Sequence, residues 1–348
     1  MNYPQCYWQD LKKVLPAILG LKQLSHAKIL ITGAGGLIGS AVADLLLCAN
    51  DELHLENVVY LGARNPDKIA KRFGAMLDRP DVCYFPYDAL KPIQSEVCFD
   101  YIIHGASPAN PAAYVTQPVE TMLANITGME NLLRSAHKWQ TKRVLFVSSS
   151  EVYGRKESAE EPYREGEYGF VDILNPRACY PSAKRAAETL CAAFQKEYGV
   201  DSVIARPGHV YGPTATPEDN RASSQFFQDV ISGRDIVMKS AGTQMRSYCY
   251  VADCASALLA ILINGQSVTA YNVSNRRSII TIRQLAEMIA QCNGKQVVFE
   301  NPSDVELSGY NMMDNSSLDS SALEQLGWES KFDAMEGIRH TFEIMSKQ

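Results

Sequence analysis

The sequence predicts an α/β fold, a doubly wound parallel sheet with a smaller C-terminal lobe. Short apolar segments alternate with longer segments of helical pattern, and this alternation is typical of parallel strands that are buried on both faces. A glycine-rich turn joins the first apolar segment to the first helical one. Right-handed crossovers between successive strands then give helices on both faces of the sheet.

Composition excludes several other classes of protein. The chain has 348 residues, of which 46% are hydrophobic and 21% charged, and a net charge of −6. These values are typical of a folded domain with a sizeable core. A nucleic-acid partner usually requires a basic face, so we expect none. Charged residues interrupt the N-terminal segment and no run of about 18 apolar residues occurs, so we expect a cytoplasmic protein without a membrane partner.

Cysteine and histidine usage predicts neither disulfides nor a metal site. The nine cysteines are scattered without a CxxC pair, and the six histidines are equally dispersed. Free thiols in a reducing compartment follow from this pattern, and we expect no bound metal.

The predicted elements divide the chain into three parts. The predicted strands are 28–32, 57–61, 82–85, 101–104, 143–147 and 202–205, and the predicted helices are 37–49, 118–137 and 178–198. We expect the main domain over 27–213 and the lobe over 214–348, with 247–275 returning in part to the main domain. Residues 1–26 precede the first strand. The helical spacing of Leu11, Val14, Leu15, Ile18 and Leu19 predicts a short helix docked on the surface.

The turn after the first strand contains a phosphate-binding pattern. It reads TGAGGLIG over residues 32–39, in which Gly33, Gly36 and Gly39 form GxxGxxG. The first glycine allows the tight turn, the second lets backbone N–H groups approach a pyrophosphate, and the third lets the helix pack close to the strand. The positive end of the helix then faces the phosphates. Because the motif opens the first βαβ unit, it predicts a dinucleotide cofactor.

The residue after the second strand bears on the choice between NAD and NADP. An acidic residue there usually holds the adenosine ribose, but this chain reads Leu61-Gly62-Ala63-Arg64-Asn65. Arg64 at a 2′-phosphate would favour NADP, whereas an arginine stacked on adenine or solvated would not. Asp88, just after the third strand, is the candidate that would contact the adenine amine instead. The sequence leaves NAD or NADP open.

A second constellation supplies groups for hydride and proton transfer. The fifth strand runs into Ser148-Ser149-Ser150-Glu151, and the sequence YPSAK follows at 180–184. Tyr180 and Lys184 share one face of a helix. A lysine cation beside a tyrosine, helped by the nicotinamide charge, lowers the pKa of the phenol. The phenolate can then take a proton from an alcohol as hydride leaves, and Ser149 can hydrogen-bond the same oxygen.

Together these motifs resemble the extended short-chain dehydrogenase/reductase family, in its sugar-nucleotide epimerase/dehydratase group. The resemblance covers about residues 27–290 and includes HGAS at 104–107, SSSEVYG at 148–154, RPGHVYGP at 206–213 and RSYCYVAD at 246–253. It implies a Rossmann-like domain, a nicotinamide cofactor, a nucleoside-diphospho-sugar substrate and, commonly, a homodimer. The cofactor contacts that it implies fall on Gly33, Gly36, Leu37, Ile38, Gly39, Ala106, Ser107, Asn125, Ser148, Tyr180, Lys184 and Pro207.

Within this group, two stretches are similar to UDP-glucuronate decarboxylases, namely HGASPANP at 104–111 and PRACYPSAKRAAET at 176–189. The resemblance places Ser150 and Glu151 beside the C5 substituent of the sugar and Arg177 beside the sugar. It places Arg221 and Arg246 at the diphosphate or uridine. His209 stands where an asparagine is usual, so that a hydrogen bond to the substrate is expected to differ.

Several reactions share hydride abstraction from C4 of the sugar, which gives a 4-keto intermediate. Loss of a C5 carboxylate would then be decarboxylation, and return of hydride to the other face would be C4 epimerisation. Glu151 favours chemistry at C5, although it would also serve to hydrogen-bond sugar hydroxyls. Ser150 is a poor general acid, which disfavours dehydration.

We therefore expect a decarboxylase- or epimerase-type enzyme that retains its cofactor. The alternative, favoured by Arg64, is an NADPH-dependent 4-keto-sugar-nucleotide reductase. A remote alternative is a non-catalytic dinucleotide-binding sensor.

Overall fold

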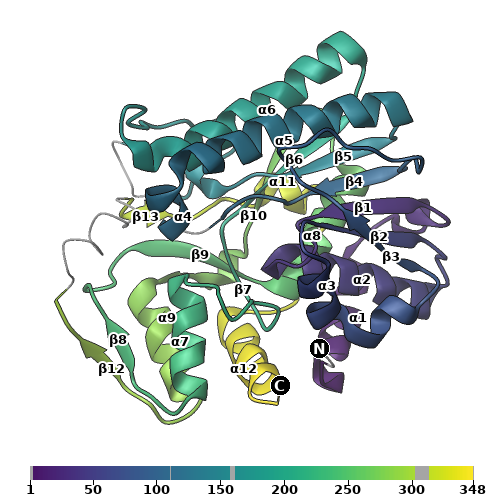
Figure 1. The fold of residues 1–348 in the computed structure, drawn as a ribbon. Helices are drawn as coiled ribbons and strands as arrows, with labels where there is room; N and C mark the ends of the chain where they lie inside the picture. The colour runs from purple at the N-terminus through teal and green to yellow at the C-terminus, as the bar shows by residue number, and fades with distance from the viewer. Residues whose placement is uncertain (1–2, 110, 157–160, 302–312, 348) are drawn as a thin grey trace.

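A seven-stranded parallel sheet forms the centre of the molecule. The structure is a computed structural model that describes residues 3–109, 111–156, 161–301 and 313–347. The strand order is β10-β6-β5-β4-β1-β2-β3 (Figure 1), which confirms the predicted doubly wound sheet. The strands are β1 Lys28–Thr32, β2 Val58–Ala63, β3 Val82–Pro86, β4 Tyr101–His104, β5 Arg143–Val147, β6 Ser202–Pro207 and β10 Ala270–Val273.

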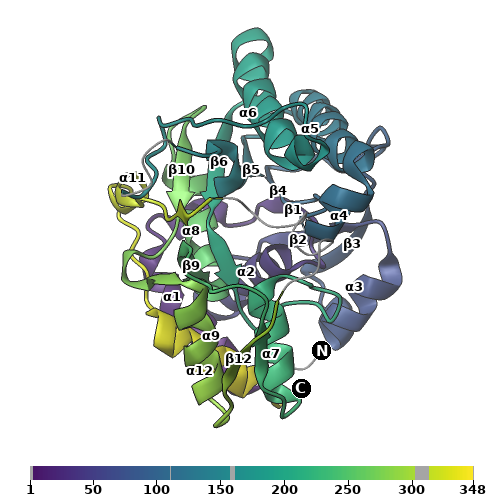
Figure 2. The same ribbon diagram turned by 90° about the vertical axis from the view of Figure 1, so that its left-hand side faces the viewer.

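Helices cover both faces of this sheet (Figures 1 and 2). One face carries α5 (Pro118–Trp139) and α6 (Cys179–Tyr198), and the other carries α2 (Leu37–Leu53) and α8 (Val251–Asn264). Alternate strand residues enter the two cores: Leu30 packs in the core of α5 and α6, whereas Ile29 and Ile31 pack in the core of α2 and α8. Burial on both faces explains why the strands are continuously apolar.

The strand order reverses direction beside β1, whose neighbours are β2 on one side and β4 on the other. The loops that follow β1 and β4 therefore leave the carboxyl edge in opposite directions. This is the switch point at which open α/β sheets bind their ligands. The fold thus places the glycine turn after β1 at the expected ligand crevice.

Short strands and helices build the C-terminal part. The strand β9 (Met245–Tyr250) pairs with β7 (His209–Tyr211), β11 (Ile279–Thr281) and β13 (Asn315–Ser316). A second pair is formed by β8 (Ile236–Met238) and β12 (Val297–Phe299). The helices α7 (Ala222–Ile231), α9 (Ile282–Gln291) and α12 (Ala334–Met345) lie beside these strands (Figure 2).

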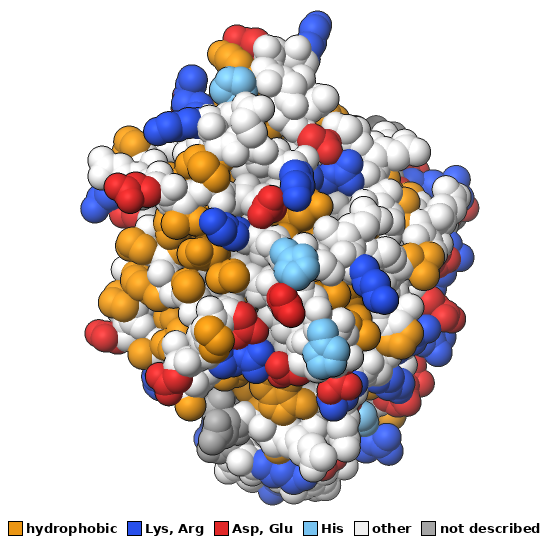
Figure 3. Space-filling model, turned by 90° about the vertical axis from the view of Figure 1, so that its right-hand side faces the viewer, with side chains coloured by type: hydrophobic (Ala, Val, Ile, Leu, Met, Phe, Trp, Pro, Cys, Tyr) orange, Lys and Arg blue, Asp and Glu red, His pale blue; other side chains and the backbone are white. Residues whose placement is uncertain are grey.

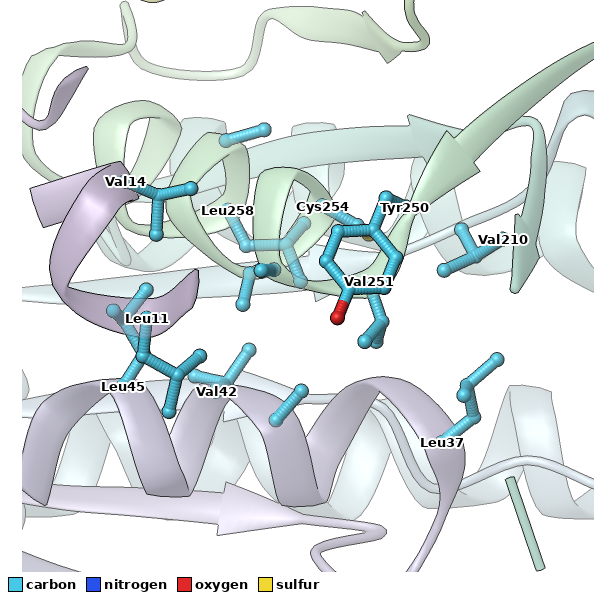
Figure 4. Packing of buried hydrophobic residues seen from close by; sticks show 14 of the residues in the cluster. Leu11, Val14, Leu37, Val42, Leu45, Val210, Tyr250, Val251, Cys254 and Leu258 are labelled. Atoms are coloured by element: carbon cyan, nitrogen blue, oxygen red, sulfur yellow. The ribbon is translucent and has the colours of Figure 1, made fainter. Parts of the chain in front are cut away.

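The N-terminal segment forms the helix α1 (Gln5–Val14), which packs on α2, α8 and α12. Leu11 and Val14 are fully buried and face α2 and α8 (Figure 4). The predicted extension of this helical pattern to Leu19 is wrong, since the α-helix ends at Val14 and Leu19 is 54% exposed. Pro16 explains the difference because it has no N–H to continue the helical ladder.

The surface shows charges of both signs. On the face drawn in Figure 3, acidic and basic side chains are interspersed with hydrophobic ones. Within the described part of the chain, no helix has the length and apolar character needed to cross a membrane. All nine cysteines are free thiols.

Candidate active site

The glycine turn brings three strand ends and one helix end together. Gly33 has a φ of +74°, and a Cβ there would lie 2.8 Å from the carbonyl carbon of Gly105. A Cβ on Gly39 would lie 2.4 Å from the carbonyl oxygen of Gly33. Neither position therefore has room for a side chain. The helix α2 begins at Leu37 with Gly36 as its N-cap and without a side-chain cap, so its first N–H groups, including those of Leu37 and Ile38, are available to an anion.

Buried polar atoms beyond β4 support the fit of a dinucleotide to these residues. The Ser107 Oγ and the Asn125 Oδ1 are buried and have no hydrogen-bond partner among the described residues. The Asn125 amide is oriented by the hydrogen bond from Nδ2 to the Thr121 carbonyl, at 2.8 Å. Ala106 donates its backbone N–H to the Thr32 hydroxyl at 3.3 Å. The cradle of glycines and the unsatisfied polar atoms both suit a polar cofactor such as NAD or NADP.

Arg64 and Asp88, the two residues expected to contact the adenosine half of the cofactor, are in different environments. Arg64 follows β2 directly and its side chain is exposed. Asp88 follows β3 and is tied to its own turn, where Oδ1 accepts the Leu90 N–H at 3.1 Å and Oδ2 lies 3.8 Å from Lys91 Nζ. Pro207, another expected cofactor contact, is buried at the end of β6.

Tyr180 and Lys184 are buried on the same face of α6. Lys184 Nζ lies 5.6 Å from the centre of the Tyr180 ring and donates to the Val147 carbonyl at 2.8 Å. Burial lowers the pKa of Lys184 to about 7, against the opposing effect of the Glu188 charge. Burial, and after it the Glu151 charge, raise the pKa of Tyr180 to about 12, against hydrogen bonds from Ser149 and Tyr114 and the charge of Arg221, which lower it. The phenol is therefore surrounded by the Lys184 amine and by the hydroxyls of Ser149 and Tyr114.

A buried network holds the turn that carries Ser149. Ser149 is the N-cap of a 3₁₀ helix, Ser150–Tyr153, and its hydroxyl accepts the Glu151 N–H at 3.2 Å. Ser148 Oγ donates to Glu188 at 2.6 Å, and Glu188 forms an ion pair with Arg206 at 2.6 Å. Ser150 is buried at the start of the same turn. Sequence reasoning missed Glu188 and Arg206 as site residues, because their link to the turn depends on the packing of α6 against β6.

Glu151 and Arg177 form an ion pair at 3.1 Å in the half-buried space next to Tyr180. The Arg177 guanidinium lies over the Tyr114 ring, 4.7 Å from its centre. Tyr114 comes from the short helix α4 (Pro111–Thr116) and stacks on Tyr180. Sequence reasoning also missed Tyr114. Its position shortly after the HGASPANP stretch was the only feature of the sequence that could have indicated a place in the site. Asn110 of that stretch lies outside the described residues.

The C-terminal part contributes two arginines to the surroundings of Tyr180 and Glu151. Arg221 pairs with Asp219, which was not expected, and Arg246 on β9 is 3% exposed. The charges of both arginines act on His209, and burial together with these cations lowers the pKa of His209 to about 3. His209 is therefore neutral, and its buried Nδ1 has no partner among the described residues. Arg246 also lies within the field of Glu151. Arginine side chains are suited to phosphate and carboxylate ligands.

The described residues contain no group of three or more His, Cys, Asp or Glu side chains placed to hold a metal ion. The titratable groups around Tyr180 are instead a lysine, a glutamate and several arginines. This set is suited to moving a proton and binding an anion.

A family model and the curated relatives both match most of this chain. The model of the NAD dependent epimerase/dehydratase family matches residues 29–274. The chain is 33% identical over 323 residues to UDP-glucuronic acid decarboxylase 6 of Arabidopsis thaliana, with 90% of this chain and 87% of that one covered. It is 30% identical over 336 residues to UDP-glucuronic acid decarboxylase 1 of Xenopus tropicalis, with 96% and 75% covered.

Solved structures share the fold. The UDP-glucose 4-epimerase of Thermotoga maritima, solved with UDP-glucose, has a TM-score of 0.78 at 24% identity, with 92% of this chain and 99% of that one covered. The dTDP-glucose 4,6-dehydratase DesIV of Streptomyces venezuelae, solved with NAD and TYD, has a TM-score of 0.79 at 21% identity, with 92% and 97% covered.

Proposed function

The chain belongs to the NAD-dependent epimerase/dehydratase family, and on this premise we propose that it is a sugar-nucleotide decarboxylase acting on a UDP-glucuronate-type substrate. The observation that carries this proposal is the Glu151–Arg177 ion pair next to Tyr180. Plain C4 epimerisation needs no acid–base group beside C5, whereas decarboxylation must deliver a proton to C5 after the carboxylate has left. The decarboxylase names of the relatives agree with this choice.

Residues 27–213 would form the cofactor domain in this proposal. The turn of Gly33, Gly36 and Gly39 and the first N–H groups of α2 would hold the pyrophosphate, and Ser107 and Asn125 would supply their unsatisfied polar atoms. When bound, the nicotinamide accepts hydride from C4 of the sugar and later returns it.

Tyr180 would accept and return the proton of the C4 hydroxyl. Its phenolate would accept the proton of the C4 hydroxyl as the C4–H bond breaks, and Ser149 would hydrogen-bond the same oxygen. A protonated Lys184 stabilises the phenolate, because a nearby cation favours the charged form of an acid. The burial of both side chains strengthens this interaction by excluding water.

The 4-keto group then makes the C5 carboxylate a leaving group. The C5–carboxylate bond breaks, its electron pair moves into an enolate with the ketone, and carbon dioxide leaves. Arg177 would bind the carboxylate of the sugar, and Glu151 and Ser150 would lie beside C5. C5 then takes up one proton from solvent, hydride returns to C4, and Tyr180 returns its proton to the C4 oxygen, which completes a redox-neutral reaction.

Residues 214–348 would mainly bind the nucleotide, with 247–275 returning in part to the cofactor domain. Arg221 and Arg246 would hold the diphosphate or uridine, and neutral His209 would add a hydrogen bond. A chain with a net charge of −6 can bind a diphosphate in this way because the cations act locally. Residues 1–26 would act as a helical extension.

We also propose a homodimer. The helix α5 and the preceding α4 expose apolar side chains, including Val115, Val119, Met122 and Leu123, which are 36–62% exposed. Burying such a row against a second copy is a common reason for its presence on a surface.

One experiment tests the reaction. Incubation of the purified protein with UDP-glucuronate is expected to release carbon dioxide and a UDP-pentose, and Tyr180→Phe is expected to abolish both. Mass spectrometry of ligands released from the purified protein would identify the nucleotide and the cofactor. Carbon dioxide release that is unaffected by Tyr180→Phe would show that the assigned mechanism is wrong.

Arg64 favours a second candidate, the NADPH-dependent 4-keto reductase. In that case NADPH would be consumed only when a 4-keto sugar nucleotide is supplied, and UDP-glucuronate would be inert. A non-catalytic sensor would bind the dinucleotide and turn over neither substrate.

A further inference from the structure

The N-terminal helix α1 contacts both parts of the chain that the crevice requires. It packs on α2 and α8, which cover the central sheet, and on α12 of the C-terminal part. Burial of apolar residues such as Leu11 and Val14 already favours this docking. Tyr7 and Asp10 of the same helix also bury polar groups, and apolar packing does not explain these.

Tyr7 connects α1 to the helix that begins at the glycine turn. The Tyr7 hydroxyl donates to Asp44 Oδ2 at 2.8 Å, and both residues are fully buried. Asp44 lies on α2 and also forms an ion pair with Arg72 of the helix α3 (Pro66–Phe73). Asp44 is about two turns from Leu37 along α2. Tyr7 therefore holds α1 in place relative to the end of α2 that is expected to bind the pyrophosphate.

Asp10 connects the same helix to the strand that carries Arg246. Its carboxylate accepts the Tyr250 hydroxyl through Oδ2 at 2.7 Å, and Oδ1 lies 2.8 Å from Nδ1 of His340 on α12. Tyr250, labelled in Figure 4, is the last residue of β9, where this strand meets α8. Arg246 lies four residues earlier on the same face of β9, and β7 with His209 is paired to this strand. Asp10 therefore holds the end of the strand that positions both residues.

Stability alone does not explain a carboxylate at position 10. Asp10 is 3% exposed, and a buried charge is costly to desolvate, so apolar side chains of similar volume often stabilise a fold as well or better. A hydrogen bond has a preferred distance and direction, whereas the hydrophobic effect has none. Tyr7 and Asp10 are thus suited to setting the placement of α1 rather than to adding stability.

We propose that Tyr7 and Asp10 are positioning residues, through which α1 acts as a clamp that fixes β9 relative to α2. Arg246 and the pyrophosphate-binding end of α2 then keep one separation, and C4 of the sugar keeps its distance from the nicotinamide. Hydride transfer depends on this alignment, since a displacement of about 1 Å can lower a rate about 10²-fold. The inference rests on the proposed function for the identity of the two ligands, and it adds a role in the reaction for the N-terminal extension.

The double variant Asp10→Leu/Tyr250→Phe tests the clamp at the β9 end. It removes the polar contact without leaving either partner unpaired, and His340 is partly exposed and can reach water. Its melting temperature is expected to stay close to that of the wild type. The Kd values for NAD⁺ and for UDP, measured by titration of protein freed of bound nucleotide, are expected to be unchanged. The kcat for carbon dioxide release from UDP-glucuronate is expected to fall about 10- to 100-fold.

Three further variants separate positioning from packing. Asp10→Asn is expected to keep a kcat near that of the wild type, because its amide can accept the Tyr250 hydroxyl and donate to the His340 ring. Gln9→Leu places the same apolar side chain at the neighbouring exposed position of α1 and is the matched control, with no change expected. Tyr7→Phe releases the α2 end of the clamp. It is expected to lower kcat alone but to add little to the double variant, because a clamp acts only when both ends hold.

Hydrogen exchange measured by mass spectrometry tests the clamp without turnover. In the ligand-free double variant, exchange is expected to be faster than in the wild type in α1, β9 and α12, the elements that the Asp10 carboxylate joins. Exchange in α5 and α6, on the other face of the sheet, is expected to be unchanged.

Each contrary result has a distinct meaning. A lower melting temperature with faster exchange throughout the sheet and an unchanged kcat would make both residues merely structural, and it would overturn the proposal. A large rise in the Kd for UDP alone would also overturn it, because Asp10 would then shape the substrate site itself. A wild type that releases no carbon dioxide from UDP-glucuronate would contradict the proposed function. The exchange of β9 would still decide the clamp in that case, and unaltered exchange in the double variant would overturn it.

Discussion

The rings of Tyr114 and Tyr180 are stacked, with their centres 4.5 Å apart and their planes 16° from parallel. The Tyr114 hydroxyl is one of the groups that lower the pKa of Tyr180 through a hydrogen bond. Because the Arg177 guanidinium lies over the same Tyr114 ring, this ring connects Tyr180 to the Arg177–Glu151 ion pair.

Tyr114→Phe removes the hydroxyl and keeps the stacked ring. The pKa of Tyr180 is expected to rise, since its phenolate loses a donor. The acidic limb of the pH profile of kcat then moves to higher pH, and turnover near pH 7 falls by roughly 3- to 10-fold, the worth of one net hydrogen bond. At high pH the two rates are expected to converge. Tyr198→Phe, at the exposed end of α6, is the control; a change in KM alone would contradict the prediction.

Lys184→Met tests the buried cation. Turnover is expected to fall by about 10²- to 10⁴-fold, the usual contribution of a group that assists proton transfer. The pKa of Lys184 is lowered to about 7 in the folded protein, so between pH 7 and about 10 the unfolded chain binds this proton and the folded chain does not. Lys184 therefore costs stability below its unfolded pKa, and stability rises with pH across this window.

The same variant is consequently expected to unfold at a melting temperature equal to or above that of the wild type at pH 7, as measured by differential scanning calorimetry. A large fall in melting temperature would show that Lys184 is mainly structural.

Glu151→Gln leaves Arg177 without its carboxylate partner. With UDP-glucuronate, carbon dioxide release is expected to fall by about 10²-fold, because the group beside C5 and the orientation of Arg177 both change. Binding of the dinucleotide, measured by titration, is expected to be unchanged, since the glycine turn lies elsewhere in the crevice. Unchanged carbon dioxide release would remove Glu151 from the proposed mechanism.

Val119→Asp combined with Leu123→Asp introduces charges into the apolar row on α5. Both side chains are exposed, at 62% and 46%, so that a single chain tolerates the change. Light scattering after size exclusion is expected to show a dimer for the wild type and a monomer for the variant. A monomeric wild type would contradict the homodimer.

Leu11→Ala tests whether the N-terminal helix contributes to stability. Leu11 is fully buried against α2 and α8 (Figure 4), and its truncation is expected to cost about 2–5 kcal/mol in the free energy of unfolding. Leu19→Ala, at a 54% exposed site, is the matched control and is expected to change it by less than about 0.5 kcal/mol. Urea unfolding measures both, and equal effects would contradict the assigned packing.

The strands of the central sheet were predictable because burial on both faces demands continuous apolar residues. Each of the strands β1 to β6 lies within two residues of its expected bounds. The strands β8, β11 and β12 each have three residues and are partly exposed, so they carry no comparable pattern. The helix α1 ends at Val14 because of Pro16. The prediction followed the apolar spacing as far as Leu19 and gave too little weight to this proline.

The sequence by itself determined the features that depend on local backbone geometry. The glycine turn needs positions without a Cβ, and the spacing of Tyr180 and Lys184 puts them on one face of any α-helix. Only the tertiary structure decided which side chains of separate elements meet: Tyr114 on Tyr180, Arg177 with Glu151, and Arg206 with Glu188. These contacts depend on how the helices pack against the sheet, and no residue spacing along the chain encodes those distances.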